Sequence, residues 1–291
     1  MPWRLRRITF AIAGLDRGST QQSKPGASAA LKLGLQTRRR LHEPDGRGDP
    51  VGISLGTKPT AGLMAMTTKA AQAPPLQLFG FWRSLATYRV RIGLRLKGLE
   101  WTEEIVDLLK GEQYREGFAA RNPQQRLPVL VLDDGRLLAQ SLAILEYLEE
   151  SRPQPSLWPE DRYQRALARQ FALISIADSH PLIVPRIRHH LAETFGADEA
   201  AIEAWGRHWM DQGLRAMEAL LARPERPAGA FCYGDEPGVA DIALASHCAG
   251  AGYFNCPLDP YAGVQSVLER CMALPAFSET HPLAVTAATG G

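Results

Sequence analysis

The chain has 291 residues, of which 45% are hydrophobic and 22% are charged, so it is long enough for two ordinary domains with buried cores. Its net charge of +2 conceals an asymmetry, because residues 1–65 carry 11 Lys/Arg against 4 Asp/Glu and the remainder carries 22 against 27. The mildly acidic remainder argues against nucleic acid as the main partner. No apolar run in the sequence approaches the length of a membrane-spanning helix, which argues against a membrane protein.

Residues 1–75 are not expected to form a domain. The first 41 residues are rich in arginine, and Pro, Gly and Ser recur as far as Pro75 without a helical or strand period. An organelle transit peptide fits the acid-poor start, whereas a secretory signal fits less well because its apolar run is short. A translation start at Met64 or Met66 is the favoured explanation, because residues 42–63 resemble no targeting signal. In each case we expect this leader to be disordered.

The cysteines fall in the last quarter of the chain and comprise Cys232, Cys248, Cys256 and Cys271. They form no C-x-x-C pair, and no histidine spacing completes a zinc site, so neither redox nor metal chemistry is expected. Buried, reduced cysteines are the default for such a chain, and they suit a cytoplasmic, reducing compartment.

The chain becomes regular at residue 76, where an apolar strand precedes a helix. The strand is predicted at Leu76–Phe81, and the helix ends at Gly98, a residue typical of helix C-termini. Ser84 is then expected to be the N-cap of the helix, with Thr87 as an alternative. Amides in a first helical turn have no partner within the helix and carry partial positive charge, so an anion is stabilised there.

A thiolate is one anion that this helix start could stabilise. Converting a thiol with a pKa of about 8.5 mostly to thiolate at neutral pH requires about 2.7 kcal/mol. A hydrogen bond from Ser84 would supply about 1.5–3 kcal/mol and the helix N-terminus about 0.3–2 kcal/mol, so the two together suffice. On this pattern alone, an ordinary capping serine is the favoured interpretation, because serine is a leading N-cap residue.

The order of predicted elements from residue 76 to residue 152 is β-α-β-α-β-β-α, which is the thioredoxin-like arrangement. A hairpin turn is predicted at Asp133-Asp134-Gly135. The other predicted elements are strands at Trp101–Asp107, Val129–Leu132 and Arg136–Ala139, and helices around Gln113–Ala120 and from Gln140 to Arg152.

A proline-rich linker, residues 153–160, separates this α/β thioredoxin-like domain, residues 76–152, from an all-α helical C-terminal domain, residues 161–291. No strand pattern returns after the linker. The predicted helices are Asp161–Ser179, interrupted at His180-Pro181, and then Asp198–Ala222, Gly238–Gly250 and Tyr261–Leu274.

Two further features of the first domain suggest a ligand. A cis peptide at Leu127-Pro128 would leave the Leu127 amide and carbonyl free to pair with an extended, peptide-like ligand. Ser141 is expected to be the N-cap of the next helix and to offer its hydroxyl and nearby amides to a carboxylate. Each feature alone has an ordinary structural explanation. Together with Ser84 they fit a small anionic tripeptide that carries a thiol.

Five motifs resemble those of zeta-class glutathione transferases and the related maleylacetoacetate and maleylpyruvate isomerases. They are Phe81–Ile92, Asn122–Pro128, Gln140–Glu150, His180–Leu182 and Gly234–Asp241. The resemblance extends from about Leu76 to Pro282 and implies the glutathione transferase fold, with a thioredoxin-like N-terminal domain and a helical C-terminal domain. It also changes the favoured role of Ser84 from a cap to a catalytic group.

The resemblance implies glutathione as the cofactor, with Ser84 donating a hydrogen bond that keeps its sulfur as thiolate. The positions that it implies for binding the tripeptide are Gln113, Leu127, Gln140, Ser141 and His180. Arg83 and Arg186 fall where the isomerases meet substrate carboxylates. In those enzymes the thiolate adds to a cis double bond, and rotation and elimination give the trans isomer. Two simpler alternatives stay open: His180 as a polar residue at a helix end and Arg83 as a solvated charge.

Three departures from the family pattern bear on the substrate. Leu85-Ala86 stand where Ser-Cys or Ser-Ala is usual, and Ile183-Val184 stand where many members have two asparagines. Tyr253 stands where an arginine grips a substrate carboxylate in the isomerases, and a tyrosine cannot replace a bidentate charged pair. These departures keep glutathione binding but weaken the prediction of a dianionic isomerase substrate.

The main hypothesis is a cytosolic, dimeric, zeta-like glutathione transferase that activates glutathione for attack on a small electrophilic substrate. The first alternative is the glutathione-dependent cis–trans isomerase of aromatic amino-acid breakdown. A third hypothesis, from another class, is a non-catalytic module with the same fold that binds glutathione or a partner. The expected partners are therefore glutathione, a small electrophile and a second copy of the chain, without a metal.

Overall fold

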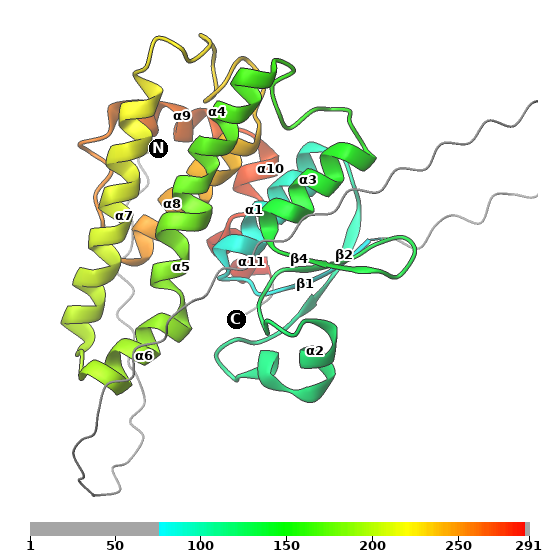
Figure 1. Cartoon of the computed structure of the whole chain (residues 1–291), viewed down its shortest axis with the longest axis vertical. Coiled ribbons are helices and arrows are strands. Elements are labelled where there is room, and N and C mark those ends of the chain that lie inside the picture. The colour runs from blue at the N-terminus through cyan, green and yellow to red at the C-terminus, as the bar shows by residue number, and fades with distance from the viewer. Residues whose placement is uncertain (1–75, 289–291) are drawn as a thin grey trace, which may run out of the picture. The chain divides into compact units, whose positions relative to one another are not determined.

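The computed structural model describes residues 76–288, and the predictions about the leader lie outside this range. The first half contains a four-stranded mixed sheet (Figure 1). β1 (Leu76–Gly80) is parallel to β2 (Trp101–Ile105) and antiparallel to β3 (Val129–Val131), which is itself antiparallel to β4 (Leu137–Ala139). The order across the sheet is therefore β2-β1-β3-β4. The predicted hairpin turn between β3 and β4 is confirmed, with Gly135 at a φ of +82° that favours glycine.

Helices cover both faces of the sheet, because successive side chains of a strand point to opposite sides. The helical elements of this half are α1 (Leu85–Leu96), the 3-10 turn η1 (Glu112–Tyr114), α2 (Glu116–Arg121) and α3 (Ser141–Ser151). On one face Leu78 and Leu130 pack with α1 and α3, and on the other Phe79 packs against Phe118 of α2. The predicted β-α-β-α-β-β-α order is confirmed.

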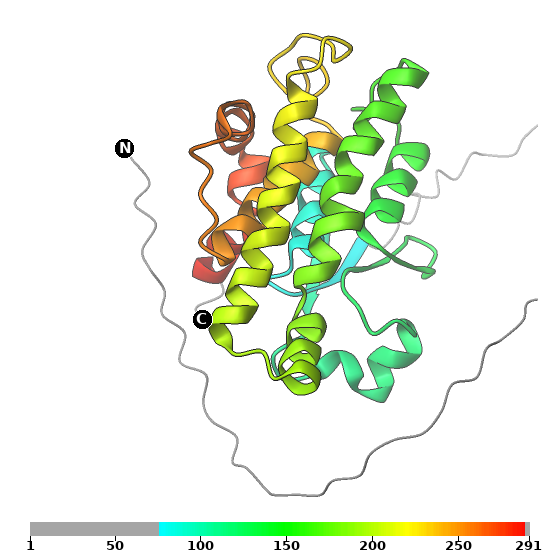
Figure 2. The same cartoon turned by 60° about the vertical axis from the view of Figure 1, so that its left-hand side comes forward.

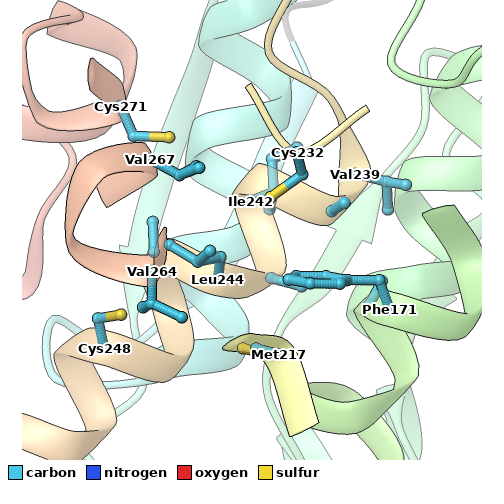
Figure 3. Packing of buried hydrophobic residues seen from close by; sticks show 14 of the residues in the cluster. Phe171, Met217, Cys232, Val239, Ile242, Leu244, Cys248, Val264, Val267 and Cys271 are labelled. Atoms are coloured by element: carbon cyan, nitrogen blue, oxygen red, sulfur yellow. The ribbon is translucent and has the colours of Figure 1, made fainter. Parts of the chain in front are cut away.

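The second half, within residues 162–288, contains helices and no paired strands. Its elements are α4 (Arg162–Leu173), the π-helical turn η2 (Ile174–Ser179), α5 (His180–Ile183), α6 (Pro185–Phe195), α7 (Glu199–Leu221), α8 (Val239–Tyr253), α9 (Ala262–Met272), α10 (Pro275–Ser278) and α11 (Pro282–Ala288). α8 lies at the centre, with 12 of its 15 residues buried, and α4 and α7 both pack against it (Figure 2). The core around α8 includes Phe171 of α4, Met217 of α7 and Val264 of α9 (Figure 3). The prediction of buried, unpaired cysteines is also confirmed.

α1 belongs to both halves of the fold. Its residues Val90 and Leu94 join the core beneath the sheet, whereas Tyr88 and Ile92 join the core around α8. The hydroxyl of Tyr88 donates a hydrogen bond to the Phe277 carbonyl of α10 at 3.0 Å. The start of α1 is therefore fixed by contacts from both halves.

The segment between α3 and α4 is attached to α1 through the buried Lys97. Its ammonium group donates to Glu149 Oε2 at 2.9 Å, to the Arg152 carbonyl at 2.7 Å and to the Pro155 carbonyl at 2.8 Å. The amide of Leu157 donates to the same Glu149 oxygen at 2.9 Å. The predicted linker, which contains no helix or strand, is thus held against the first half, while the domain boundary placed in it stays a prediction.

The predicted interruption at His180-Pro181 is wrong. The helix that begins as α4 continues through η2 and through both residues as far as Ile183. Pro181 has no amide to donate to the preceding turn, and that turn is the widened π-helical segment Ile174–Ser179. The break falls at Val184, which is extended (φ −67°, ψ 155°) because it precedes Pro185.

None of the helices formed by residues 76–288 is both long and apolar enough to cross a membrane.

Candidate active site

Ser84 lies between β1 and α1, and the prediction that it caps α1 is confirmed. Its backbone is extended (φ −74°, ψ 117°), and its Oγ accepts a hydrogen bond from the Thr87 amide at 3.2 Å. Thr87, the alternative cap, lies inside the helix. Because the Ser84 oxygen acts as the acceptor for the helix, its own hydrogen remains available to a ligand. The first turn of α1 contains no acidic residue, so this end of the helix favours an anion.

The prediction that Ser141 caps α3 is wrong by one position. Gln140 is the N-cap, and its carbonyl accepts the first helical bond from the Ile144 amide at 2.9 Å. Ser141 is therefore the first residue of α3. Gln140 has a φ of +73° and ψ of 116°, a conformation that costs a non-glycine residue about 1–3 kcal/mol and is found mostly at functional sites. Its side-chain amide donates to Gln124 Oε1 at 2.8 Å.

A buried arginine, which the sequence did not reveal as a site residue, connects α1, α3 and α8. Arg89 is 1% exposed, and its Nε donates to Ser141 Oγ at 3.0 Å while Nη1 donates to Ser246 Oγ at 3.0 Å. None of the ion pairs within residues 76–288 includes Arg89, and burial lowers its pKa to about 9. Because Arg89 occupies the Ser141 oxygen, the Ser141 hydrogen is available to a ligand acceptor, which would also meet the arginine's positive charge.

The loop before β3 and the turn η1 supply two sites for peptide groups. The Leu127-Pro128 peptide is cis, as predicted. The Leu127 amide and carbonyl make no hydrogen bond with other residues of the range 76–288. Gln113 is 7% exposed, and its Oε1 is shielded from solvent without a hydrogen-bond partner among the described residues. A buried polar group left unpaired costs about 1–3 kcal/mol, so the Gln113 oxygen fits an N–H group of a ligand.

His180 is half-buried at the point where η2 passes into α5. Burial, and then the charge of Arg89, hold the pKa of His180 well below its usual range. His247 and Arg186 lower it further. His180 is therefore a neutral imidazole at neutral pH, with one nitrogen as donor and the other as acceptor.

The structure brings together two of the three predicted substrate residues. The guanidinium carbon of Arg83 lies 4.7 Å from the centre of the Tyr253 ring, and the Tyr253 hydroxyl donates to the Arg83 carbonyl at 3.2 Å. Burial raises the pKa of Tyr253 to about 12, so its hydroxyl stays protonated at neutral pH. Arg186 is exposed on α6 and acts electrostatically on His180. A further arginine of α6, Arg188, is electrostatically coupled to Arg83 and was not predicted as a site residue.

Two of the family departures, Leu85 and Ile183, are apolar residues that approach the same glycine of α8. Leu85 and Ile183 are each 4% exposed and belong to the core around α8. Both approach Gly250 of α8, where an added Cβ would lie 2.8 Å from Leu85 Cδ1 and 3.8 Å from Ile183 Cδ1. A glycine at this position lets α8 approach the start of α1 closely.

The described residues contain no group of three or more side chains able to hold a metal ion.

The chain is similar to known glutathione-dependent proteins. A family model described as the glutathione S-transferase N-terminal domain matches residues 83–151. Maleylacetoacetate isomerase of Pseudomonas aeruginosa is 39% identical over 209 residues, which are 71% of this chain and 96% of the relative. Maleylpyruvate isomerase of a Ralstonia species is 43% identical over 211 residues, 72% of this chain and 98% of the relative.

Solved structures agree with these relatives. The holo structure of a bacterial maleylpyruvate isomerase, a glutathione S-transferase of the zeta class, has a TM-score of 0.69 at 40% identity and covers 72% of this chain and 97% of its own. A maleylacetoacetate isomerase of Methylobacterium extorquens AM1, solved with malonate and glutathione, has the same TM-score, identity and coverages. The chain therefore belongs to the glutathione S-transferase family, and within it to the zeta class. The predicted family and the predicted transferase fold are confirmed.

Proposed function

We propose that the protein is a glutathione-dependent cis–trans isomerase whose substrate is a small unsaturated dicarboxylate of the maleylacetoacetate or maleylpyruvate type. The names of the relatives favour this alternative over a transferase with an unspecified electrophile. The observation that carries the proposal is the Ser84 hydroxyl, whose oxygen is held by the Thr87 amide at the start of α1 and whose hydrogen is available to a sulfur anion. A purely binding module would not require this arrangement.

The residues of the first half fit the groups of glutathione, which is a tripeptide with two carboxylates. The Leu127 backbone, beside a cis proline, suits a peptide unit, and the unpartnered Gln113 oxygen suits an N–H donor. Ser141 suits a carboxylate, because Arg89 donates to its oxygen and leaves its hydroxyl hydrogen available. Gln140 lies in the strained position beside it. When bound, glutathione supplies a thiolate that adds reversibly to a conjugated double bond.

The chain's own contribution is to keep the sulfur deprotonated and to place the electrophile. Ser84 and the amides of α1 stabilise the negative sulfur. His180 is neutral, so one of its ring nitrogens can donate a hydrogen bond to glutathione and the other can accept one. Arg83, fixed on Tyr253, offers positive charge beside Ser84 to a substrate carboxylate. Arg186, exposed on α6, adds positive charge near His180.

Turnover of maleylacetoacetate and maleylpyruvate with added glutathione tests the proposal. We expect isomerisation by the wild type and a loss of about 10- to 150-fold in Ser84→Ala, equivalent to one hydrogen bond to a charged group. Ser84→Thr keeps a hydroxyl and serves as the matched control. Absence of isomerisation by folded wild-type protein that still conjugates glutathione to a generic electrophile would replace the isomerase by the transferase. Glutathione binding without either reaction would favour the binding module.

The proposal includes a cytosolic homodimer. The four buried cysteines of the described range are all free, which suits a reducing compartment. Light scattering of the purified protein tests dimerisation, which rests on the family resemblance. Mass spectrometry of the native N-terminus tests the location, because a start at Met64 or Met66 would remove the arginine-rich leader.

A further inference from the structure

Arg188 lies on the half-buried face of α6, together with Ile187 and Leu191. None of the residues of α6 is fully buried, and Arg186, two positions earlier, is exposed. By contrast, the Nε of Arg188 is shielded from solvent and has no hydrogen-bond partner among the described residues. Its guanidinium carbon lies 5.9 Å from the centre of the Phe254 ring. A guanidinium donor that has lost its water without gaining an acceptor requires an explanation.

A second guanidinium group, that of Arg83, acts on Arg188. Burial, and then the charge of Arg83, lower the pKa of Arg188, so the two guanidinium groups act on each other. None of the ion pairs within residues 76–288 includes Arg188. Two like charges in a poorly hydrated place repel each other, and an anion that binds both removes that repulsion.

Both guanidinium groups lie on neighbouring aromatic rings at the end of α8. Arg83 lies over Tyr253 at 4.7 Å, and Arg188 lies over the next residue, Phe254, at 5.9 Å. The Phe254 ring is fixed against Gly206 of α7, where any Cβ would collide with it. Because Arg83 directly precedes Ser84 in the chain, this pair of arginines stands beside the group proposed to hold the reactive sulfur.

We propose that Arg188 binds a carboxylate of the electrophile together with Arg83, and so selects a doubly negative substrate. This inference rests on the proposed isomerase function and deepens it. Tyr253 occupies the position at which the family resemblance implies an arginine, and Arg188 returns a guanidinium to the same region from a different helix. The planar guanidinium, with Nε as one of its donors, can bind a carboxylate through two parallel hydrogen bonds.

Calorimetric titration of the full chain with two ligands tests this role. The ligands are glutathione and S-(1,2-dicarboxyethyl)glutathione, which carries two additional carboxylates next to the sulfur. We expect Arg188→Gln to weaken binding of the dicarboxyethyl ligand by about 10- to 100-fold, the effect of losing a charge-assisted contact, and to leave glutathione affinity unchanged within about twofold. Arg188→Lys keeps the positive charge but loses the parallel N–H donors of the guanidinium, so we expect an intermediate loss of affinity for the dicarboxyethyl ligand. Arg215→Gln removes an exposed arginine of α7 and should change neither affinity.

An equal loss of affinity for both ligands in Arg188→Gln or Arg188→Lys would assign Arg188 a structural role and overturn the inference. Unchanged affinity for the dicarboxyethyl ligand in both variants would overturn it as well, while leaving the proposed function intact. If folded wild-type protein bound neither ligand, the proposed function itself would fail. Thermal unfolding of each variant identifies misfolding, and Arg188→Lys preserves the test should Arg188→Gln not fold.

Discussion

The guanidinium carbon of Arg83 lies 4.7 Å above the Tyr253 ring, and the Tyr253 hydroxyl donates to the Arg83 carbonyl at 3.2 Å. The tyrosine that replaces an expected arginine therefore contacts the residue that precedes Ser84. It cannot neutralise a carboxylate, but it fixes the backbone and the guanidinium of Arg83 together. We infer that Tyr253 acts on the substrate through Arg83.

Tyr253→Phe removes the hydrogen bond to the Arg83 carbonyl and keeps the ring. We expect KM for the dicarboxylate to rise about 2- to 10-fold with little change in kcat, because a neutral hydrogen bond contributes about 0.5–1.5 kcal/mol. Tyr253→Ala also removes the ring beneath Arg83 and should raise KM further. Steady-state kinetics measure both effects, with the exposed Tyr163→Phe as the matched control. An unchanged KM in Tyr253→Ala would contradict the positioning role.

Ser84→Ala should raise the pKa of the bound glutathione thiol by about 1 to 2, because a hydrogen bond to a charged group contributes about 1.5–3 kcal/mol. A thiol with a raised pKa is less ionised at neutral pH, so the activity of the variant should recover as the pH increases. The ultraviolet absorbance of the thiolate, followed during a pH titration of the bound complex, measures the change. Ser84→Thr should retain most of the lowering. The role of Ser84 would be refuted by identical titration curves for the wild type and Ser84→Ala.

Arg89→Lys should weaken glutathione binding about 10-fold, because the lysine loses the Nε donor that orients Ser141 while keeping a buried charge. Ser246→Ala is the matched control, since it removes the other hydrogen bond of Arg89 and leaves Ser141 in place. We expect both variants to lose stability but only Arg89→Lys to lose glutathione affinity. Calorimetric titration and thermal unfolding separate the two effects. Equal affinities for both variants would show that Arg89 is only structural.

Lys97→Met should lower the free energy of unfolding by about 3–5 kcal/mol, because it removes the buried partner of Glu149 and leaves this carboxylate with the more distant, partly exposed Arg165 at 3.8 Å. The double variant Lys97→Met/Glu149→Leu removes that charge and should recover part of the loss. Denaturant unfolding measures each value. A double variant less stable than Lys97→Met would count against this explanation.

The same network makes the stability depend on pH. Burial by itself raises the pKa of Glu149, but hydrogen bonds, led by the one from the Leu157 amide, lower it overall. A carboxyl whose pKa is lower in the folded state stabilises the fold at pH values above its unfolded pKa of about 4.3. That contribution is lost as the pH falls through the folded pKa. Unfolding curves between pH 7 and acid pH should therefore show a smaller acid-induced loss in Glu149→Gln than in the wild type.

The elements of the first half could be predicted because local signals there agree with tertiary packing. The apolar strands, the Asp133-Asp134-Gly135 turn and the cap at Ser84 each depend on neighbouring residues. The cis proline at Leu127-Pro128 was expected from its place in the loop before the strand that begins at Val129. The predictions failed where the outcome depends on backbone geometry, as at Gln140, or on a widened helical turn, as at His180-Pro181.

The two residues that the proposals add to the site, Arg89 and Arg188, are both arginines on helices. A charged residue in a helical pattern is ordinarily assigned to the solvated face. Arg89 is instead buried by α3 and α8, which come from parts of the chain about 50 and 150 residues away. Arg188 is turned inward by its contact with Phe254 at the end of α8. Both positions depend on the packing of distant segments, so no local periodicity indicates them. The one signal in the sequence that could have pointed to Arg89 is the high density of arginine in this stretch, which includes Arg83, Arg89 and Arg91.

Because α1 contributes side chains to both hydrophobic cores, it restricts the movement of the two halves relative to each other. Any sliding between the halves would expose Val90 and Leu94 or Tyr88 and Ile92 to water. α6 has no residue of comparable burial and carries Arg186 and Arg188, which we propose bind the electrophile. Slow amide hydrogen exchange along α1 and rapid exchange along α6 should follow. On the proposed function, we expect substrate and product to pass by local opening of α6, while Ser84 keeps its place at the start of α1.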